Sequence, residues 1–487
     1  MNRLTPSASV PSGPPGTYDV VVIGAGPVGE NVAARVVQAG LNALIVEGEL
    51  VGGECSYWAC IPSKAMLRPP TALETARSVD GARQATTDRL DAVATLARRD
   101  RFVNGWQDDG QVDWLKSAGV DLLRGWARVT GERQVTIDAL ERGPQVVIAR
   151  HAVVVATGSA ASLPAIEGID EVGAWTNREA TAATVVPRRL AVIGGGAVGS
   201  ELAAAWSALG SDVTLLARGP HLLSSWEPFA RDAAAEGLRS DGVDVRTNTG
   251  VRRAARQADG TVRLTLSDGS VLTSDEMLVA TGRRARTDGL GLEEFGLRSG
   301  EWLDVDDTCR VTGVPDGWFY AVGDVNHRAT LTHMGKYQAR ACAAAIVARA
   351  EGTEPAPERY GRWSATADAV AVPQVLFTRP ELAMVGLTER RARERGLRVR
   401  AVEYPLGQVA GASLSADGYR GHAKMVVDEE AGVVAGCTLV GPGVGELIHA
   451  GTVAVVGEVP LERLWHAVPS FPTASEIWLR LLEEYGL

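Results

Sequence analysis

The chain has 487 residues, which exceeds what one hydrophobic core usually accommodates and predicts two to four domains. Its apolar content of 45% and charged content of 22% are typical of a globular protein. The formal net charge of −10, without any basic run, argues against a nucleic-acid partner.

The cysteines and the N-terminal residues indicate the cellular compartment of the protein. Three of the five cysteines are isolated in the sequence. This is not the pattern of a disulfide framework, and it is typical of proteins in a reducing compartment. Residues 1–16 are rich in Pro, Ser and Gly, do not resemble a signal peptide, and are predicted to be a flexible tail. No apolar stretch reaches membrane-spanning length. We therefore expect a cytoplasmic protein with no membrane partner.

The first predicted elements form a strand, a Gly-rich turn, a helix and a second strand. Residues 18–29, YDVVVIGAGPVG, are a β-branched run that leads into Gly24, Gly26 and Gly29. A helical pattern follows, and the next strand ends at Glu47. Glycines at this spacing let the backbone approach a pyrophosphate at the helix N-terminus, and the acid suits a ribose diol. The context predicts a dinucleotide site.

The same unit returns 170 residues later. The segment LAVIGGGAVGSELAAAWSALGSDVTLLAR carries Gly194, Gly196 and Gly199. Each unit also closes on an apolar strand followed by Ala-Thr-Gly, which gives Ala156–Gly158 (with Thr157) in the first and Ala280–Gly282 in the second. Two such units predict two dinucleotides.

The two units differ at the end of the second strand. Ala217 stands where Glu47 stands in the first unit, and Arg218 follows it. A missing acid with an adjacent Arg suits a 2′-phosphate and favours NADPH, although NADH remains possible. The alternative is that Arg218 is a solvated turn residue and the protein does not discriminate.

The rest of the chain supplies connecting elements. Residues 69–109 read as polar, Ala-rich helix, and residues 120–160 as short strands. The strand GWFYAVGDV ends in Gly323 and Asp324, and a helix follows. The polar, Pro-containing segment 351–368 is predicted to be a linker into a last domain.

Two cysteines lie close together between the nucleotide units, in the stretch VGGECSYWACIPSK. Five residues along a regular helix separate Cα atoms by roughly 8–9 Å, more than the ~7 Å that a disulfide permits. If Cys55 and Cys60 form a disulfide, Cys55 must lie before the helix begins. Gly52 and Gly53 permit the irregular backbone that this requires. A zinc site is disfavoured because no second Cys/His pair lies at ligand spacing. We interpret the two as a redox-active pair.

This block resembles the GG-x-C-x4-C-IPSK signature of the class I pyridine nucleotide-disulfide oxidoreductases, a family that includes dihydrolipoamide dehydrogenase, glutathione reductase and mercuric reductase. The resemblance extends from Tyr18 to Glu476. It implies an α/β fold with two Rossmann-like dinucleotide-binding domains and a C-terminal α+β interface domain that forms a homodimer. It assigns FAD to the first nucleotide unit and NAD(P)H to the second.

The resemblance also implies residue roles. Cys60 would face the flavin, Cys55 would attack the acceptor, and Lys64 and Glu201 match a Lys–Glu pair beside the flavin. The residues implied for FAD are Gly24, Gly26, Gly29, Glu47, Gly53, Lys64, Thr157, Gly158, Gly323 and Asp324, and those implied for NADP are Gly194, Gly196, Gly199, Arg218 and Gly282. The implied domains are a tail (1–16), the FAD-binding domain (17–160 and 285–365), the NAD(P)H-binding domain (161–284) and the interface domain (366–487).

The chain departs from the family at its acid–base motif. The family has His-Pro-Thr-x-x-Glu near the C-terminus, whereas this chain has Phe471 in place of the His and retains Glu476. Phe cannot accept the proton of Cys55 or return it. General acid–base catalysis of this kind typically accelerates a proton-transfer step by about 10²–10⁴. His466 could substitute if the loop were rearranged, or it is a bystander. Mercury reduction is disfavoured because the chain ends LLEEYGL without the adjacent cysteines of mercuric reductases, and begins without their metal-binding domain.

The residues between the cysteines also depart from the family. Tyr57, Trp58 and Ala59 stand where relatives usually have Asn-Val-Gly. The two large rings could narrow the approach to Cys55 or stack on an aromatic substrate, or they could fill core beneath the flavin.

The sequence thus predicts a flavoenzyme that passes electrons from NADPH through FAD to Cys55 and Cys60, and on to a disulfide-type small-molecule acceptor. The alternative is a reductase of quinones, dyes or metal ions that does not use the His–Glu step. A flavin-bearing sensor that turns over slowly is a third interpretation, against which two complete nucleotide sites argue. No resident metal is expected.

Overall fold

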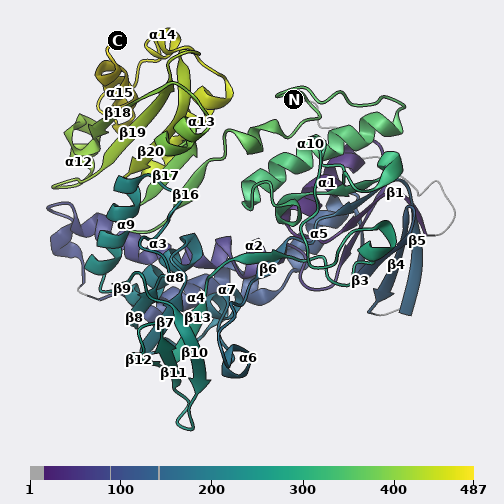
Figure 1. Ribbon diagram of the computed structural model, residues 1–487, viewed down its shortest axis with the longest axis horizontal. Helices are drawn as coiled ribbons and strands as arrows, with labels where there is room; N and C mark the ends of the chain where they lie inside the picture. The colour runs from purple at the N-terminus through teal and green to yellow at the C-terminus, as the bar shows by residue number, and fades with distance from the viewer. Residues whose placement is uncertain (1–15, 88, 141–142) are drawn as a thin grey trace. The chain divides into compact units, whose positions relative to one another are not determined.

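The computed structural model describes residues 16–87, 89–140 and 143–487 (Figure 1). The predicted tail, residues 1–16, lies outside the described residues except for Gly16. The chain forms two compact units. The first unit holds the described residues up to Ile61 together with Val103–Ala160 and Arg283–Ala369, and the second holds Pro62–Phe102, Ala161–Gly282 and Val370–Leu487. The domain boundaries expected from the sequence remain a prediction.

A parallel sheet carries the first Gly-rich turn. Its strands lie in the order β3-β2-β1-β5-β15, and Ile23 pairs with Val46 on one side and Val155 on the other. The far parts of β3 and β5 continue into an antiparallel ladder with β4. The strands of this unit are β1 (Thr17–Ile23), β2 (Ala43–Glu47), β3 (Asp121–Gly131), β4 (Gln134–Ala139), β5 (Gly143–Val155), β6 (Ser159–Ala161), β14 (Arg283–Ala285) and β15 (Phe319–Ala321).

Both faces of this sheet are buried. Val20 and Val22 pack on one face, against helices α1 (Pro27–Gln38) and α10 (Thr332–Ala350), which lie side by side in Figure 1. Val21 and its neighbours pack on the other face with the antiparallel ladder. Burial on both faces explains why the strand reads as a continuous apolar run rather than an alternating one. The remaining helices of the unit are α2 (Gly53–Tyr57) and α5 (Asp109–Ser117).

The second unit repeats this arrangement. Ile193 pairs with Leu216 and with Val279, 170 positions after the pairing of Ile23 with its first partner. The repeat read from the sequence is therefore a structural repeat. Its elements are β7 (Arg189–Ile193), α8 (Ala197–Ala208), β8 (Asp212–Leu216), α9 (Pro228–Ser240), β9 (Asp244–Arg246) and β13 (Glu276–Val279), with an antiparallel sheet of β10 (Val251–Arg256), β11 (Val262–Leu266) and β12 (Val271–Ser274).

The C-terminal part is an antiparallel sheet covered by helices, which confirms the expected α+β region. The strand order is β16-β17-β20-β19-β18. Leu439 of the sheet, Ile448 of α13 and Leu481 of α15 share its core. The elements are β16 (Gln374–Leu376), β17 (Leu382–Gly386), β18 (Val399–Pro405), α12 (Ala410–Ser415), β19 (His422–Asp428), β20 (Val433–Val440), α13 (Val444–Val456) and α15 (Ile477–Tyr485).

Two segments differ from the sequence prediction. The helix expected over 69–109 is interrupted, because α3 (Cys60–Arg77) ends before α4 (Ala92–Phe102) begins. The expected linker 351–368 is partly buried at its end, where Ser364 and Asp368 are 2% and 5% exposed. Within the described residues no helix is long and apolar enough to cross a membrane.

Candidate active site

The first Gly-rich turn packs backbone against backbone. Gly24 has φ of 103°, and a Cβ on it would lie 2.6 Å from the carbonyl oxygen of Ala156. Around Gly26, by contrast, a Cβ would meet no heavy atom within 4 Å. The turn thus presses against the Ala-Thr-Gly segment on one side and leaves open space at the N-terminus of α1, where a pyrophosphate binds in this motif.

The residues around this turn fit a dinucleotide. Glu47 accepts hydrogen bonds from the backbone N–H groups of Ala25 and Glu49, both at 2.7 Å. The hydroxyl of Thr157 is buried and has no hydrogen-bond partner among the described residues. A buried hydroxyl without a hydrogen-bond partner is energetically unfavourable. An oxygen or nitrogen of a bound ligand would supply the missing partner. The first unit therefore fits FAD.

Asp324 is tied to the segment that carries Cys55. Its Oδ2 accepts a hydrogen bond from Ser159 Oγ at 2.5 Å, and Ser159 Oγ accepts one from Arg283 Nε at 2.6 Å. Arg283 also donates to Glu54 Oε1 at 2.9 Å. Glu54 directly precedes Cys55. The polar chain holds the Gly323–Asp324 turn and the dithiol helix together within the first unit.

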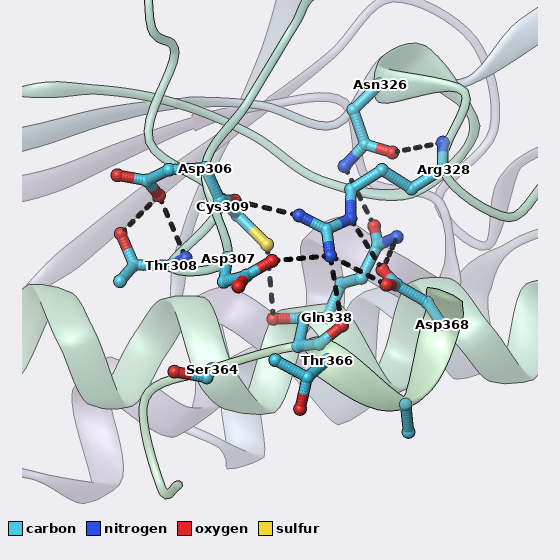
Figure 2. Close-up of polar contacts among 12 residues, drawn as sticks. Asp306, Asp307, Thr308, Cys309, Asn326, Arg328, Gln338, Ser364, Thr366 and Asp368 are labelled. Atoms are coloured by element: carbon cyan, nitrogen blue, oxygen red, sulfur yellow. Dashed lines mark hydrogen bonds and ion pairs between the residues drawn. The ribbon is translucent and has the colours of Figure 1, made fainter. Parts of the chain in front are cut away.

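A charged network, drawn in Figure 2, also contacts this turn. Gln338 Oε1 accepts the backbone N–H of Gly323 at 2.8 Å, and its Nε2 donates to Asp368 Oδ2 at 2.9 Å. Arg328 binds Asp368 through two nitrogens, at 2.8 and 2.9 Å, and Asp307 at 2.8 Å. We call Asp307, Arg328, Gln338 and Asp368 the Arg328 network.

The two cysteines meet at the N-terminus of α10. Thr332 Oγ1 donates to Cys55 Sγ at 3.1 Å and lies 3.5 Å from Cys60 Sγ. Cys55 and Cys60 are both free thiols, and their sulfurs hydrogen-bond to each other. The partial positive charge of a helix N-terminus favours a thiolate, so the first turn of α10 is a suitable place for reactive sulfur.

The local backbone differs from the expected one in one respect. Cys60 begins α3, so Cys55 lies outside the long helix as pairing would require, but it belongs to the short helix α2 rather than to an irregular entry. Gly53 starts α2, and a Cβ there would lie 2.8 Å from Gly26 Cα. The close approach joins the cysteine segment to the first Gly-rich turn.

The two rings between the cysteines have different surroundings. Tyr57 is 3% exposed and its hydroxyl donates to the carbonyl of Gln107 at 3.4 Å. This favours the core interpretation for Tyr57. Trp58 is half-buried, with its ring 5.7 Å from that of Tyr57.

The second Gly-rich turn has the geometry of the first. A Cβ on Gly194 would lie 2.2 Å from the carbonyl oxygen of Ala280, and one on Gly196 would meet nothing within 4 Å. Gly199 packs against the Gly194 carbonyl as Gly29 packs against that of Gly24. The second unit therefore fits a dinucleotide too.

No acid stands after the second strand of this unit. Ala217 follows β8 and is buried, whereas Arg218 is exposed. Gly282, at the end of the Ala-Thr-Gly segment, accepts the backbone N–H of Ser162 at 3.0 Å through its carbonyl. An exposed guanidinium at this position is free to meet an anionic group of a ligand.

Lys64 and Glu201 form an ion pair in the second unit. Lys64 Nζ lies 2.5 Å from Glu201 Oε2, and Glu201 Oε1 accepts the backbone N–H of Phe377 at 3.0 Å. The Lys64 ammonium also lies 5.1 Å from the centre of the Phe377 ring. These contacts fix the lysine side chain, which remains 36% exposed.

The altered acid–base motif lies in the second unit. Phe471 is 75% exposed and His466 is also exposed. Glu476 is buried, receives Arg480 Nη2 on Oε1 at 3.4 Å, and has no hydrogen-bond partner for Oε2 among the described residues. The motif thus retains a buried carboxylate with spare acceptor capacity, while Phe471 has no group that could donate a hydrogen bond to it.

Sequence reasoning missed the Arg328 network and the Glu54–Arg283 pair. The members of each come from segments far apart in the chain, and charge pairing across a fold leaves no periodic signal. The remaining three cysteines, Cys309, Cys342 and Cys437, are buried, and burial raises the pKa of each thiol.

Comparison with known proteins shows the family to which the chain belongs. The model of the pyridine nucleotide-disulphide oxidoreductase family matches residues 18–352, and that of the family's dimerisation domain matches residues 372–481. The chain is 34% identical over 469 residues to a dihydrolipoyl dehydrogenase of Thermus scotoductus, covering 94% of this chain and 95% of that protein. It is 29% identical over 474 residues to a mercuric reductase of Staphylococcus aureus, covering 95% and 81%.

A solved structure of similar fold agrees with this family assignment. The Cu(II) complex of the HOCl-induced flavoprotein disulfide reductase RclA from Escherichia coli superposes with a TM-score of 0.81 at 25% identity, over 96% of this chain and 99% of that one. The chain therefore belongs to the pyridine nucleotide-disulphide oxidoreductase family and is a FAD-dependent, pyridine nucleotide-linked oxidoreductase with Phe in place of the family's C-terminal catalytic His.

Proposed function

We propose that the protein is an NADPH-dependent disulfide reductase in which electrons reach Cys60 and Cys55 and then a disulfide-type small molecule. The observation that carries this proposal is the contact of Thr332 with both sulfurs at the N-terminus of α10. In this scheme Cys60 faces the flavin and Cys55 attacks the acceptor. FAD supplies the two-electron carrier between the nicotinamide and the dithiol.

The proposed cofactor contacts follow the two repeats. FAD is held by the first Gly-rich turn, Glu47, Gly53, Thr157, Gly158 and the Gly323–Asp324 turn, and NADPH by the second turn, Arg218 and Gly282. Lys64, oriented by Glu201, places a positive charge beside the flavin, where it favours the reduced ring. We further propose a cytoplasmic homodimer assembled through residues 366–487, with Glu476 at the acceptor site.

Replacing Arg218 by Ala tests the nicotinamide preference. Loss of a charge-assisted contact worth about 1.5–3 kcal/mol should raise the KM for NADPH by about 10- to 100-fold. The KM for NADH should stay within a factor of about two, because NADH has no 2′-phosphate. Equal changes for both nucleotides would mean that Arg218 does not read the phosphate.

A second candidate acceptor is a quinone, dye or metal ion. Phe471 favours it, because such acceptors need no proton exchange with Cys55. The similar E. coli reductase was solved as a Cu(II) complex. Among the described residues no group of three His, Cys, Asp or Glu could hold a metal, so a soft ion would have to reach the two sulfurs.

Cys55→Ser separates the two candidates. Under the proposal, NADPH-dependent reduction of small disulfides falls to background in this variant, while binding of FAD is kept. Cys437→Ser, at a buried thiol outside the first unit, is the matched control and should retain turnover. Quinone reduction that persists in Cys55→Ser while disulfide reduction is absent in both proteins would favour the second candidate.

A further inference from the structure

A surface cavity of about 270 Å³ lies between α1 and α10 within the first unit. Three of the residues that line it are arginines, and each comes from a different segment. Arg35 belongs to α1, Arg340 to α10 and Arg362 to the segment 351–368. The volume is close to the lower end of the ~300–1,000 Å³ that small-molecule sites usually occupy. A small ligand therefore fits this cavity.

The three arginines have no acidic partners. Each side chain is exposed, and within the part of the chain that the structure describes none of them forms an ion pair or a side-chain hydrogen bond. Acids are not scarce, because the chain has 59 Asp and Glu against 49 Lys and Arg. Like charges around one cavity repel each other, and such a cavity attracts ions of the opposite sign.

Tyr337 of α10 holds two of the three arginines in place. Its hydroxyl donates to the carbonyl of Ser364 at 3.2 Å and accepts the backbone N–H of Ala367 at 3.1 Å, which fixes the segment that carries Arg362. The guanidinium of Arg340 lies over the same ring, 5.3 Å from its centre. A site whose side chains are already ordered loses less entropy when a ligand binds.

Apolar side chains line another part of the cavity. Ala343 and Val347 of α10 and Ala39 at the end of α1 are among the lining residues. Ala343 is 2% exposed, so it lies deeper than the arginines. A carbon skeleton could pack on these side chains while its charged groups meet the guanidinium groups. The cavity thus suits an organic anion.

Helix ends do not explain the position of all three charges. Arg35 lies in the last turn of α1, where a cation is favoured next to the helix C-terminus, so this residue alone implies no ligand. Arg340, however, lies in the middle of α10, and Arg362 lies in a turn. Their convergence on the cavity that Arg35 lines needs a separate reason.

The cavity is separate from the two regions already described. Arg35 follows Gly26 by nine residues, which is about 13 Å along α1 from the Gly-rich turn. Arg340 follows Thr332 by eight residues, which is about 12 Å along α10 from the contact with the sulfurs. A ligand in this cavity is therefore neither the dinucleotide of the first unit nor the electron acceptor.

We propose that the cavity is a binding site for a small anion with two or more phosphate or carboxylate groups, held by Arg35, Arg340 and Arg362. A guanidinium binds either group through two parallel N–H···O bonds, and three guanidinium groups balance the charge of a multivalent anion. The proposal goes beyond the proposed function, because it assigns a ligand that takes no part in electron transfer.

The first test is calorimetric titration of the FAD-loaded protein with pyrophosphate and with citrate. NADP⁺ is kept at saturation to occupy the nicotinamide site, and the ionic strength is held constant. We expect one saturable site per chain. Arg340→Gln, like Arg362→Gln, should weaken binding by at least about tenfold, because each removes a charge-assisted contact. Tighter binding of pyrophosphate would identify a phosphate ligand, and tighter binding of citrate a carboxylate ligand.

Arg298→Gln is the matched control. Arg298 is an exposed arginine of the same unit that pairs with Glu301 at 2.9 Å and does not line the cavity. Its replacement removes the same charge from the protein but should leave the affinity unchanged. Equal weakening in Arg298→Gln and Arg340→Gln would show a general effect of net charge and would overturn the proposal.

The second test is modification of arginines by phenylglyoxal, assigned by peptide mass spectrometry. The bound anion should slow the modification of Arg35, Arg340 and Arg362 together and leave that of Arg298 unchanged. Chloride at the same ionic strength should give no such protection. Absence of binding by both anions, unchanged affinity in Arg340→Gln and Arg362→Gln, or equal protection by chloride would each overturn the proposal.

Discussion

Replacing Phe471 by His is expected to raise the turnover of small disulfides by about 10²-fold, at the low end of the range for general acid–base catalysis. The reason is that Glu476 Oε2 has no hydrogen-bond partner among the described residues, so that an imidazole whose ring N–H reaches this atom would be oriented by it. The measurement is NADPH oxidation with lipoamide and glutathione disulfide as acceptors, at several pH values. The gained activity should rise with pH through about 6.5 as the imidazole loses its proton.

Two variants control this result. Phe471→Gln provides polarity without a titrating group and should show no gain. Adding Glu476→Gln to Phe471→His should remove most of the gain, because the amide can turn its donor rather than its acceptor toward the imidazole. No gain from Phe471→His in a folded, FAD-loaded protein would show that this position does not reach the acceptor.

Asp368→Asn should lower the free energy of unfolding by about 3 kcal/mol and weaken the retention of FAD. Asp368 is 5% exposed and accepts from both Arg328 and Gln338, so loss of its charge leaves a half-buried guanidinium underpaired. Gln338 in turn holds the backbone of Gly323. Denaturant unfolding and the FAD content after ultrafiltration measure the two effects.

Asp288→Asn is the matched control for this change. Asp288 pairs with Arg284 at the surface of the same unit, and exposed pairs contribute about 0–1 kcal/mol. Its unfolding and FAD content should therefore equal those of the wild type. Equal behaviour of Asp368→Asn and Asp288→Asn would mean that the Arg328 network does not support the Gly323–Asp324 turn.

The nucleotide-binding parts of the fold could be read from the sequence because their constraints are local. Gly24 and Gly194 must each approach a neighbouring backbone carbonyl, and only glycine permits that contact at positive φ. The 170-residue repeat followed from the same requirement, and the pairings of Ile23 with Val46 and of Ile193 with Leu216 confirm it. The Lys64–Glu201 ion pair joins two residues that the family resemblance had named.

Other features of the fold and of the site could not be predicted from the sequence, because they depend on contacts between distant segments. Asp307, Arg328 and Asp368 form one network across 61 positions of sequence, and the segment that ends in Asp368 looked like a linker because its residues are polar. Glu30, an acid in the first turn of α1, belongs to no motif that would single it out in the sequence. Only the folded structure shows that its Oε1 is buried and has no hydrogen-bond partner among the described residues.

The claim that Cys55 and Cys60 carry electrons is tested most directly by an anaerobic titration of the purified protein with NADPH, followed by visible absorbance and a thiol count. If the cysteines carry electrons, a long-wavelength band from a Cys60 thiolate beside oxidised flavin appears after two electrons, together with two new thiols per chain. Direct bleaching of the flavin with no such band and no new thiols would contradict it, and would place the cysteines outside the electron path.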